Sequence, residues 1–122
     1  MTYDNLFEDF KEAIPEGMKF YEKKMKECDV DETDGKHVIF AMVIVPYIFH
    51  VVQNKEEEII KKVFCFLEEM AICEDIKVQE VLDFTILENI VDEGPEILQQ
   101  YKQYMGSNTL EQCEEVEQYF RL

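Results

Sequence analysis

Apolar side chains recur every three or four residues along most of the chain, and this helical spacing limits the fold more than any other feature. The first stripe consists of Tyr3, Leu6, Phe7, Phe10 and Ile14. The 122 residues include only four glycines and three prolines, too few for the many tight turns of a β-sandwich or barrel. The sequence therefore predicts an all-α protein.

The stripes place the helices along the chain. The first stretch covers about 4–27 and bends at Pro15, because proline suits the first turn of a new helix. An acidic loop without periodicity follows at 29–35. Further helices are predicted at 37–53, 55–73 and 76–91, then a short helix after Gly94-Pro95 and a last helix after Gly106.

We expect about six or seven short helices in antiparallel hairpins, forming either a HEAT- or armadillo-like stack or an irregular bundle. Residues 1–122 are predicted to form a single helical domain. Residues 1–36 would supply N-terminal helices and the acidic loop, and 37–122 the core helical stack. The 76–91 helix has a second apolar face, with Phe84, Leu87 and Val91, which predicts that it is sandwiched between neighbours.

The segment from Val38 to Val52 is the hardest to assign. Its valine and isoleucine content favours a strand, whereas Pro46 in mid-segment opposes a central strand. Since every other segment is helical, we predict a helix over 37–53, kinked at Pro46 and buried nearly all round. At 15 residues the apolar run is shorter than the roughly 20 that span a bilayer, so no membrane role is predicted.

Several residues in the C-terminal half are predicted to mark the ends of helices. Asp75 is predicted to be the N-cap of the 76–91 helix, and Gly106 a left-handed C-cap. Ser107 or Asn108 would cap the last helix. The residues of that helix predicted to face inward are Leu110, Cys113, Val116 and Phe120.

No catalytic, cofactor or metal-binding signature is present. The four cysteines are widely spaced and lie near neither His37 nor His50 at zinc-like intervals, so free and mostly buried thiols are expected. The acidic loop fails the calcium pattern, with Asp34 at its sixth position and Phe40 at its twelfth. There is no phosphate-binding glycine loop, and Ser107 is the only serine. The acidic N-terminus lacks a secretory signal, which predicts a cytoplasmic protein.

The net charge is −16, from 28 acidic and 12 basic side chains. Such a charge argues against nucleic acid and anionic membranes as partners. Residues 1–61 carry 14 acids and 8 bases, and the remainder 14 acids and 4 bases, so −10 of the charge lies in the second half. A candidate acidic strip for partner binding consists of Glu68, Glu69, Glu74, Asp75, Glu80, Glu88, Asp92 and Glu93.

Two interpretations of the acidic strip are open. A solvated face that opposes self-association accounts for most acidic surfaces. A patch for a basic protein is the more specific interpretation, because complementary charge speeds association.

From Pro46 onward, about two thirds of the chain resembles a family of small, acidic, uncharacterised bacterial proteins. The matching positions are Pro46, Tyr47, Phe66, Leu67, Glu68, Glu69, Met70, Ala71, Val78, Val81, Leu82, Leu87, Glu88, Tyr104, Met105, Gly106, Thr109 and Leu110. Residues 1–36 lie outside this resemblance. The family brings no established activity, but such proteins are often encoded near secreted toxins, so the resemblance implies an immunity role.

The leading hypothesis is thus a non-enzymatic protein-binding module, in its concrete form an immunity protein that neutralises a basic, nuclease-like toxin. The alternative is a helical-repeat scaffold that binds through an apolar patch near Cys65 and Ile72. An enzyme with a carboxylate or metal site is the third hypothesis. No cofactor is expected for the first two.

Overall fold

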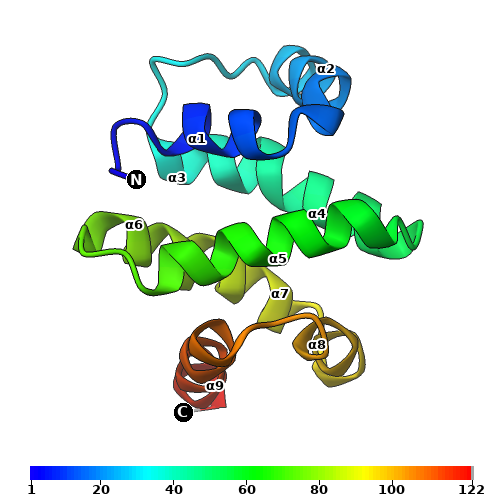
Figure 1. The fold of residues 1–122 in the computed structure, drawn as a ribbon, viewed down its shortest axis with the longest axis vertical. Helices are drawn as coiled ribbons and strands as arrows, with labels where there is room; N and C mark the ends of the chain where they lie inside the picture. The colour runs from blue at the N-terminus through cyan, green and yellow to red at the C-terminus, as the bar shows by residue number, and fades with distance from the viewer. Residues whose placement is uncertain (122) are drawn as a thin grey trace.

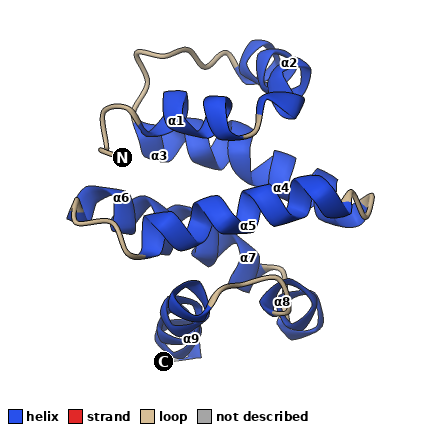
Figure 2. Ribbon diagram, in the orientation of Figure 1, coloured by secondary structure: helices blue, strands red, loops and turns tan. Residues whose placement is uncertain are grey.

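The computed structural model describes residues 1–121, and this part contains helices and loops without a strand (Figure 2). Seven helices result once continuous segments are joined, which confirms the all-α prediction. The segments are α1 (Leu6–Ala13), the 3₁₀ turn η1 (Pro15–Gly17), α2 (Met18–Cys28), α3 (Lys36–Ile39), the π-helical turn η2 (Phe40–Ile44), α4 (Val45–Gln53), α5 (Glu57–Ala71), α6 (Ile76–Val81), the π-helical turn η3 (Leu82–Leu87), α7 (Glu88–Asp92), α8 (Pro95–Lys102) and α9 (Ser107–Arg121). Segments α3, η2 and α4 form one long helix, and α6, η3 and α7 another.

The predicted bend at Pro15 is confirmed. Helix α1 lies across the view in Figure 1, whereas α2 is seen nearly end-on beside it. The Tyr21 hydroxyl holds this corner by donating a hydrogen bond of 2.8 Å to the Ile14 carbonyl. A Cβ at Gly17 would overlap the Tyr21 ring, so the corner requires glycine at that position.

The segment from Lys36 to Gln53 is helical, as predicted, and the π-helical turn ends two residues before Pro46. The expectation that this helix is buried nearly all round was wrong, because Val38 and Met42 are exposed. Helices α1, α2 and α5 and the turn η3 pack against it, and they leave that strip of its surface uncovered.

By length and composition alone, this is a helix that could cross a membrane, and half of its apolar window is buried inside the protein. Core helices of soluble proteins meet the same criterion, so the observation is weak evidence for a membrane role.

Helix α5 is the centre of the packing. It contacts α1, α4, α6, η3 and α9, which belong to both ends of the chain, and it lies between the α1–α2 and α8–α9 layers in Figure 1. In a solenoid each repeat contacts only its neighbours, so the arrangement is an irregular bundle and not a HEAT-like stack. Leu6, Phe7, Phe10 and Ile14 belong to the same core as the later helices, and the N-terminal helices are thus part of that core.

Some apolar faces predicted to be covered are not. Leu87 is fully buried, but Phe84 from the same predicted face is 57% exposed. Phe120, expected to point inward, is also exposed, whereas Cys113 and Val116 of α9 are buried. Helical spacing shows that a face is apolar, but it does not show whether another helix lies over it.

All four cysteines are free, as expected, but the prediction that they are mostly buried was wrong. Cys28 and Cys65 are exposed, Cys73 is half-buried and Cys113 is buried. Burial raises the pKa of the Cys113 thiol to about 11, so little reactive thiolate forms at neutral pH.

This difference predicts the order of alkylation in the native protein. Iodoacetamide is expected to modify Cys28 and Cys65 first and Cys113 only on unfolding, because the thiolate must be formed and accessible. Peptide mass spectrometry after timed quenching measures this, with denatured protein as the control in which all four react. Equal native rates at Cys28 and Cys113 would contradict the packing of α9.

Candidate functional site

The eight predicted acidic residues do not share one role. Three of them, Glu74, Asp92 and Glu93, are exposed at the ends of helices. Glu69 lines a hollow beside Lys61 and Lys62, between α1 and α5. The others lie in contacts or hollows of their own.

Glu68 is an internal cap and not a free surface charge. One carboxylate oxygen accepts hydrogen bonds from the Asn108 amide (3.1 Å) and side chain (2.8 Å). The other accepts from the Thr109 amide (2.8 Å) and hydroxyl (2.7 Å). Glu68 on α5 thereby satisfies the first turn of α9, a task predicted for Ser107 or Asn108.

Gly106 serves this cap by leaving room for it. The predicted left-handed C-cap at Gly106 was wrong, because Gly94 is the glycine with positive φ in the described chain. A Cβ at Gly106 would lie 2.5 Å from the Glu68 carboxyl carbon. Partial burial alone would raise the pKa of Glu68, but the hydrogen bonds from Thr109 and Asn108 outweigh it and lower that pKa to about 2.

Asp75 and Glu80 lie beyond the C-terminal end of α5, near the N-terminus of the chain. Asp75 is the N-cap of α6, as predicted, and accepts hydrogen bonds from the backbone amides of Lys77 (3.0 Å) and Tyr3 (2.9 Å). Glu80 lines a small hollow with Tyr3, His37 and Lys77. Three lysines therefore accompany acids of the predicted strip, two beside Glu69 and one beside Glu80, and they weaken any continuous negative field there.

Glu88 alone among the eight lines a groove with other carboxylates and exposed aromatic rings. The groove measures about 420 Å³ and lies between η3–α7 and α9. Its lining residues are Asp83, Phe84, Glu88, Glu115, Val116 and Tyr119. We call it the Asp83 groove. Among the described residues, it is lined by three carboxylates and by no basic side chain.

The carboxylate of Asp83 lacks compensation. Its Oδ1 atom is shielded from solvent and has no hydrogen-bond partner within the described residues. Burial, and secondarily the negative charge of Glu115, raises the pKa of Asp83 to about 6. A cation in the groove would offset both the burial of the Asp83 charge and its repulsion by Glu115.

The aromatic walls of the groove are unusually open. Phe84 is 57% and Tyr119 75% exposed, and they face solvent next to the three carboxylates. Sequence reasoning missed Asp83 and Glu115, and assigned Phe84 to a covered face. The available signal was that Glu115 and Tyr119 stand one turn apart on the last helix, on the side of Val116.

A second apolar patch is also uncovered. Ile72 and Ile76, at the α5–α6 connection, are 63% and 64% exposed, and Cys65 on α5 is exposed too. This is the region of the alternative scaffold hypothesis. Cys65 lines two hollows along α5, and Gln112, which donates to the Ala71 carbonyl beside this patch, has a buried Oε1 atom without a partner among the described residues.

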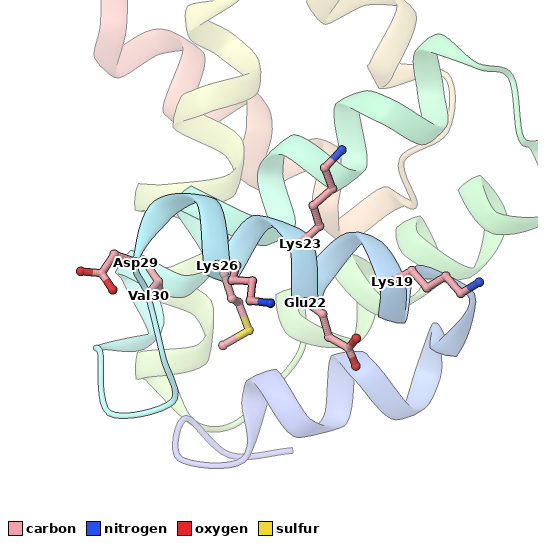
Figure 3. A pocket seen from close by; sticks show the side chains of 7 residues that line it. Lys19, Glu22, Lys23, Lys26, Asp29 and Val30 are labelled. Carbon is pink, nitrogen blue, oxygen red and sulfur yellow. The ribbon is translucent and has the colours of Figure 1, made fainter.

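A further hollow follows α2, where lysines are concentrated. Its charged residues include Lys19, Lys23 and Lys26 along with Glu22 and Asp29 (Figure 3). In Figure 3 the side chains of Lys19 and Lys23 point away from each other, and the lining is an open strip along one helix. This geometry does not converge on a ligand.

The two histidines have partners. His37 Nδ1 lies 2.7 Å from the Thr85 hydroxyl, and His50 lies against Asn54 and Glu56. Within residues 1–121, no group of three or more histidine, cysteine, aspartate or glutamate side chains is placed to hold a metal ion.

A family model matches residues 7–121, which is nearly the whole chain. The chain belongs to a domain of unknown function (DUF7674). The family thus includes α1 and α2, so the resemblance noted from Pro46 onward was too short. No curated protein and no solved structure matches the chain significantly.

Proposed function

We propose that this member of the family is a non-enzymatic protein-binding module that receives a basic protein at the Asp83 groove. The observation that carries the proposal is the groove itself, where the described lining places three carboxylates, and no basic side chain, beside two exposed aromatic rings. Exposed aromatic side chains supply most of the binding energy in many protein interfaces, and uncompensated charges select a partner of opposite sign.

The surrounding charge supports this assignment. The half of the chain that contains the groove carries −10 of the net −16, so a basic partner would be attracted from a distance. A toxin that acts on nucleic acid needs a basic site for phosphates, and an acidic protein could cover such a site. Neutralisation of a basic, nuclease-like toxin in the cytoplasm is therefore the concrete form of the proposal, as the resemblance in the sequence also implies.

Capture from the native host tests the proposal. The immobilised protein is expected to retain a basic protein at about 50 mM salt and to lose most of it at about 1 M, because salt screens exposed charges. The double variant Glu88→Gln/Glu115→Gln is expected to lose at least about tenfold in affinity for the same protein. Mass spectrometry identifies the protein, and calorimetry measures its affinity.

The matched control is Glu12→Gln/Glu58→Gln, which removes the same charge from exposed positions outside the groove. It should retain the partner almost fully. If both double variants lose affinity equally, only net charge matters and the groove is not the site. Equal capture at low and high salt would contradict charge recognition altogether.

The exposed apolar patch supports a second candidate function, a scaffold that docks an apolar surface at Ile72 and Ile76. Such an interface would bind as well or better at high salt, because salt does not screen apolar contacts. The variant Ile72→Ser/Ile76→Ser distinguishes the two candidates. It should abolish capture if the patch is the interface and leave capture unchanged if the Asp83 groove is.

A further inference from the structure

The Asp83 groove is more specific than a general acidic surface. Asp83 and Phe84 come from η3 and Glu88 from α7, while Glu115, Val116 and Tyr119 come from α9. Two helices thus supply carboxylates and aromatic rings to one hollow of about 420 Å³, a volume in the range of small-molecule pockets that has room for one long side chain.

We propose that the groove holds one arginine side chain of the basic partner, with its guanidinium at Asp83 and Glu115. This assignment rests on the proposed function and names the chemistry of recognition. Asp83 lines the groove with a carboxylate whose Oδ1 has no donor among the described residues, and Glu115 is the neighbouring negative charge. A guanidinium brings several N–H donors in a planar fork, so it can serve two carboxylates together.

The aromatic walls favour arginine over lysine. Guanidinium groups stack on aromatic faces and are less strongly hydrated than ammonium groups. The exposed rings of Phe84 and Tyr119 border the carboxylates in the same groove. Lysine would bring one compact ammonium with a tighter water shell, and it would bind more weakly.

The same arrangement makes binding depend on pH. Besides Asp83, the described titratable groups that line the groove are Glu88 from α7 and Glu115 and Tyr119 from α9. The segments α5, α6 and η2 also contact η3, but no described residue of theirs lines the groove. Because burial and Glu115 raise the pKa of Asp83 to about 6, its carboxylate becomes protonated as the pH falls through that value. Arginine binding requires the ionised form and is therefore lost on mild acidification.

Capped single amino acids test this assignment without the natural partner. The probes are the α-N-acetyl amides of arginine, of lysine and of citrulline, which is the neutral isostere of arginine. NMR titration of the whole protein should shift the Asp83 carboxyl and the rings of Phe84 and Tyr119 with the arginine probe. The order of affinity should be arginine, then lysine, then citrulline.

Variants fix the position of the site. Asp83→Asn is expected to weaken the arginine probe at least about tenfold, and Glu12→Gln to leave it unchanged. Saturation with the arginine probe should lower the Asp83 pKa, which the carboxyl chemical shift reports directly. Equal binding of citrulline, shifts centred elsewhere, or unchanged affinity in Asp83→Asn would each overturn the assignment.

The two proposals can fail separately. If Asp83→Asn still captures a basic protein in a salt-sensitive way, the protein-binding function stands and the arginine assignment is wrong. If the arginine probe binds at Asp83 but the host yields no basic partner, the site stands and the proposed function is wrong.

Discussion

Replacing Phe10 by alanine is expected to lower the free energy of unfolding by about 3–5 kcal/mol. Phe10 is fully buried, and its ring packs edge-on against three others. The ring centroids of Tyr21, Phe40 and Phe66 lie 6.0, 6.0 and 5.1 Å away. These rings belong to α2, η2 and α5, so one truncation loosens the N-terminal layer, the long helix and the central helix together.

Urea titration followed by circular dichroism measures this change. Phe84→Ala is the matched control, since it deletes the same ring from an exposed position in the Asp83 groove and is expected to cost less than about 1 kcal/mol. Similar losses for the two variants would show that Phe10 is not at the junction of these helices. A domain stable by about 10 kcal/mol, in the middle of the usual range, would retain a folded but weakened Phe10→Ala variant.

The positions of the helices were predictable because each buries a stripe at helical spacing. The Pro15 corner, the acidic loop and the restart at Pro95 follow from local rules about proline, glycine and charge. Even the ambiguous segment around Pro46 was assigned to a helix, since a strand there would have had no partner. The two π-helical turns, at Phe40–Ile44 and Leu82–Leu87, left no pattern that spacing could detect.

The covering of each face was not predictable, because it depends on which helices meet. Phe84 and Leu87 belong to one predicted face, yet only Leu87 is covered. The acidic residues show the same limit. The Asp75 cap involves neighbouring residues and was predicted, whereas Glu68 caps a helix that begins about forty residues later. The Asp83 groove likewise depends on the approach of α9 to η3, and only Glu88 of its lining was anticipated.

Glu68→Ala is expected to cost about 2–4 kcal/mol of unfolding free energy, which is large for a residue at the edge of the core. The substitution removes the acceptor of four hydrogen bonds that join α5 to α9. It also leaves Thr109 in a fully buried position with its hydroxyl donor unpaired. Urea titration measures the loss, and hydrogen exchange should show it first in the opening turn of α9.

Glu69→Ala is the matched control. It removes the same side chain from the next position of α5, where Glu69 is exposed, and it is expected to change stability by less than about 0.5 kcal/mol. Acidification gives an independent check. Because the folded pKa of Glu68 is about 2, below its ordinary 4.5, its contribution is present above pH 4.5 and is lost as the pH falls toward 2. The stability difference between the wild type and Glu68→Gln should shrink across that interval.

A double-mutant cycle with Gly106 decides whether the cap acts as described. Gly106→Ala places a methyl group where the Glu68 carboxyl lies, so it should displace the cap and cost about 1–3 kcal/mol. In the Glu68→Ala background that space is empty, and the same substitution should change stability by less than about 0.5 kcal/mol. Nearly all of the Gly106→Ala effect would then be coupling to Glu68. If the losses from Gly106→Ala and Glu68→Ala were additive, the backbone conformation at position 106 would be what requires glycine. The carboxylate of Glu68 would then not be what holds α9 in place.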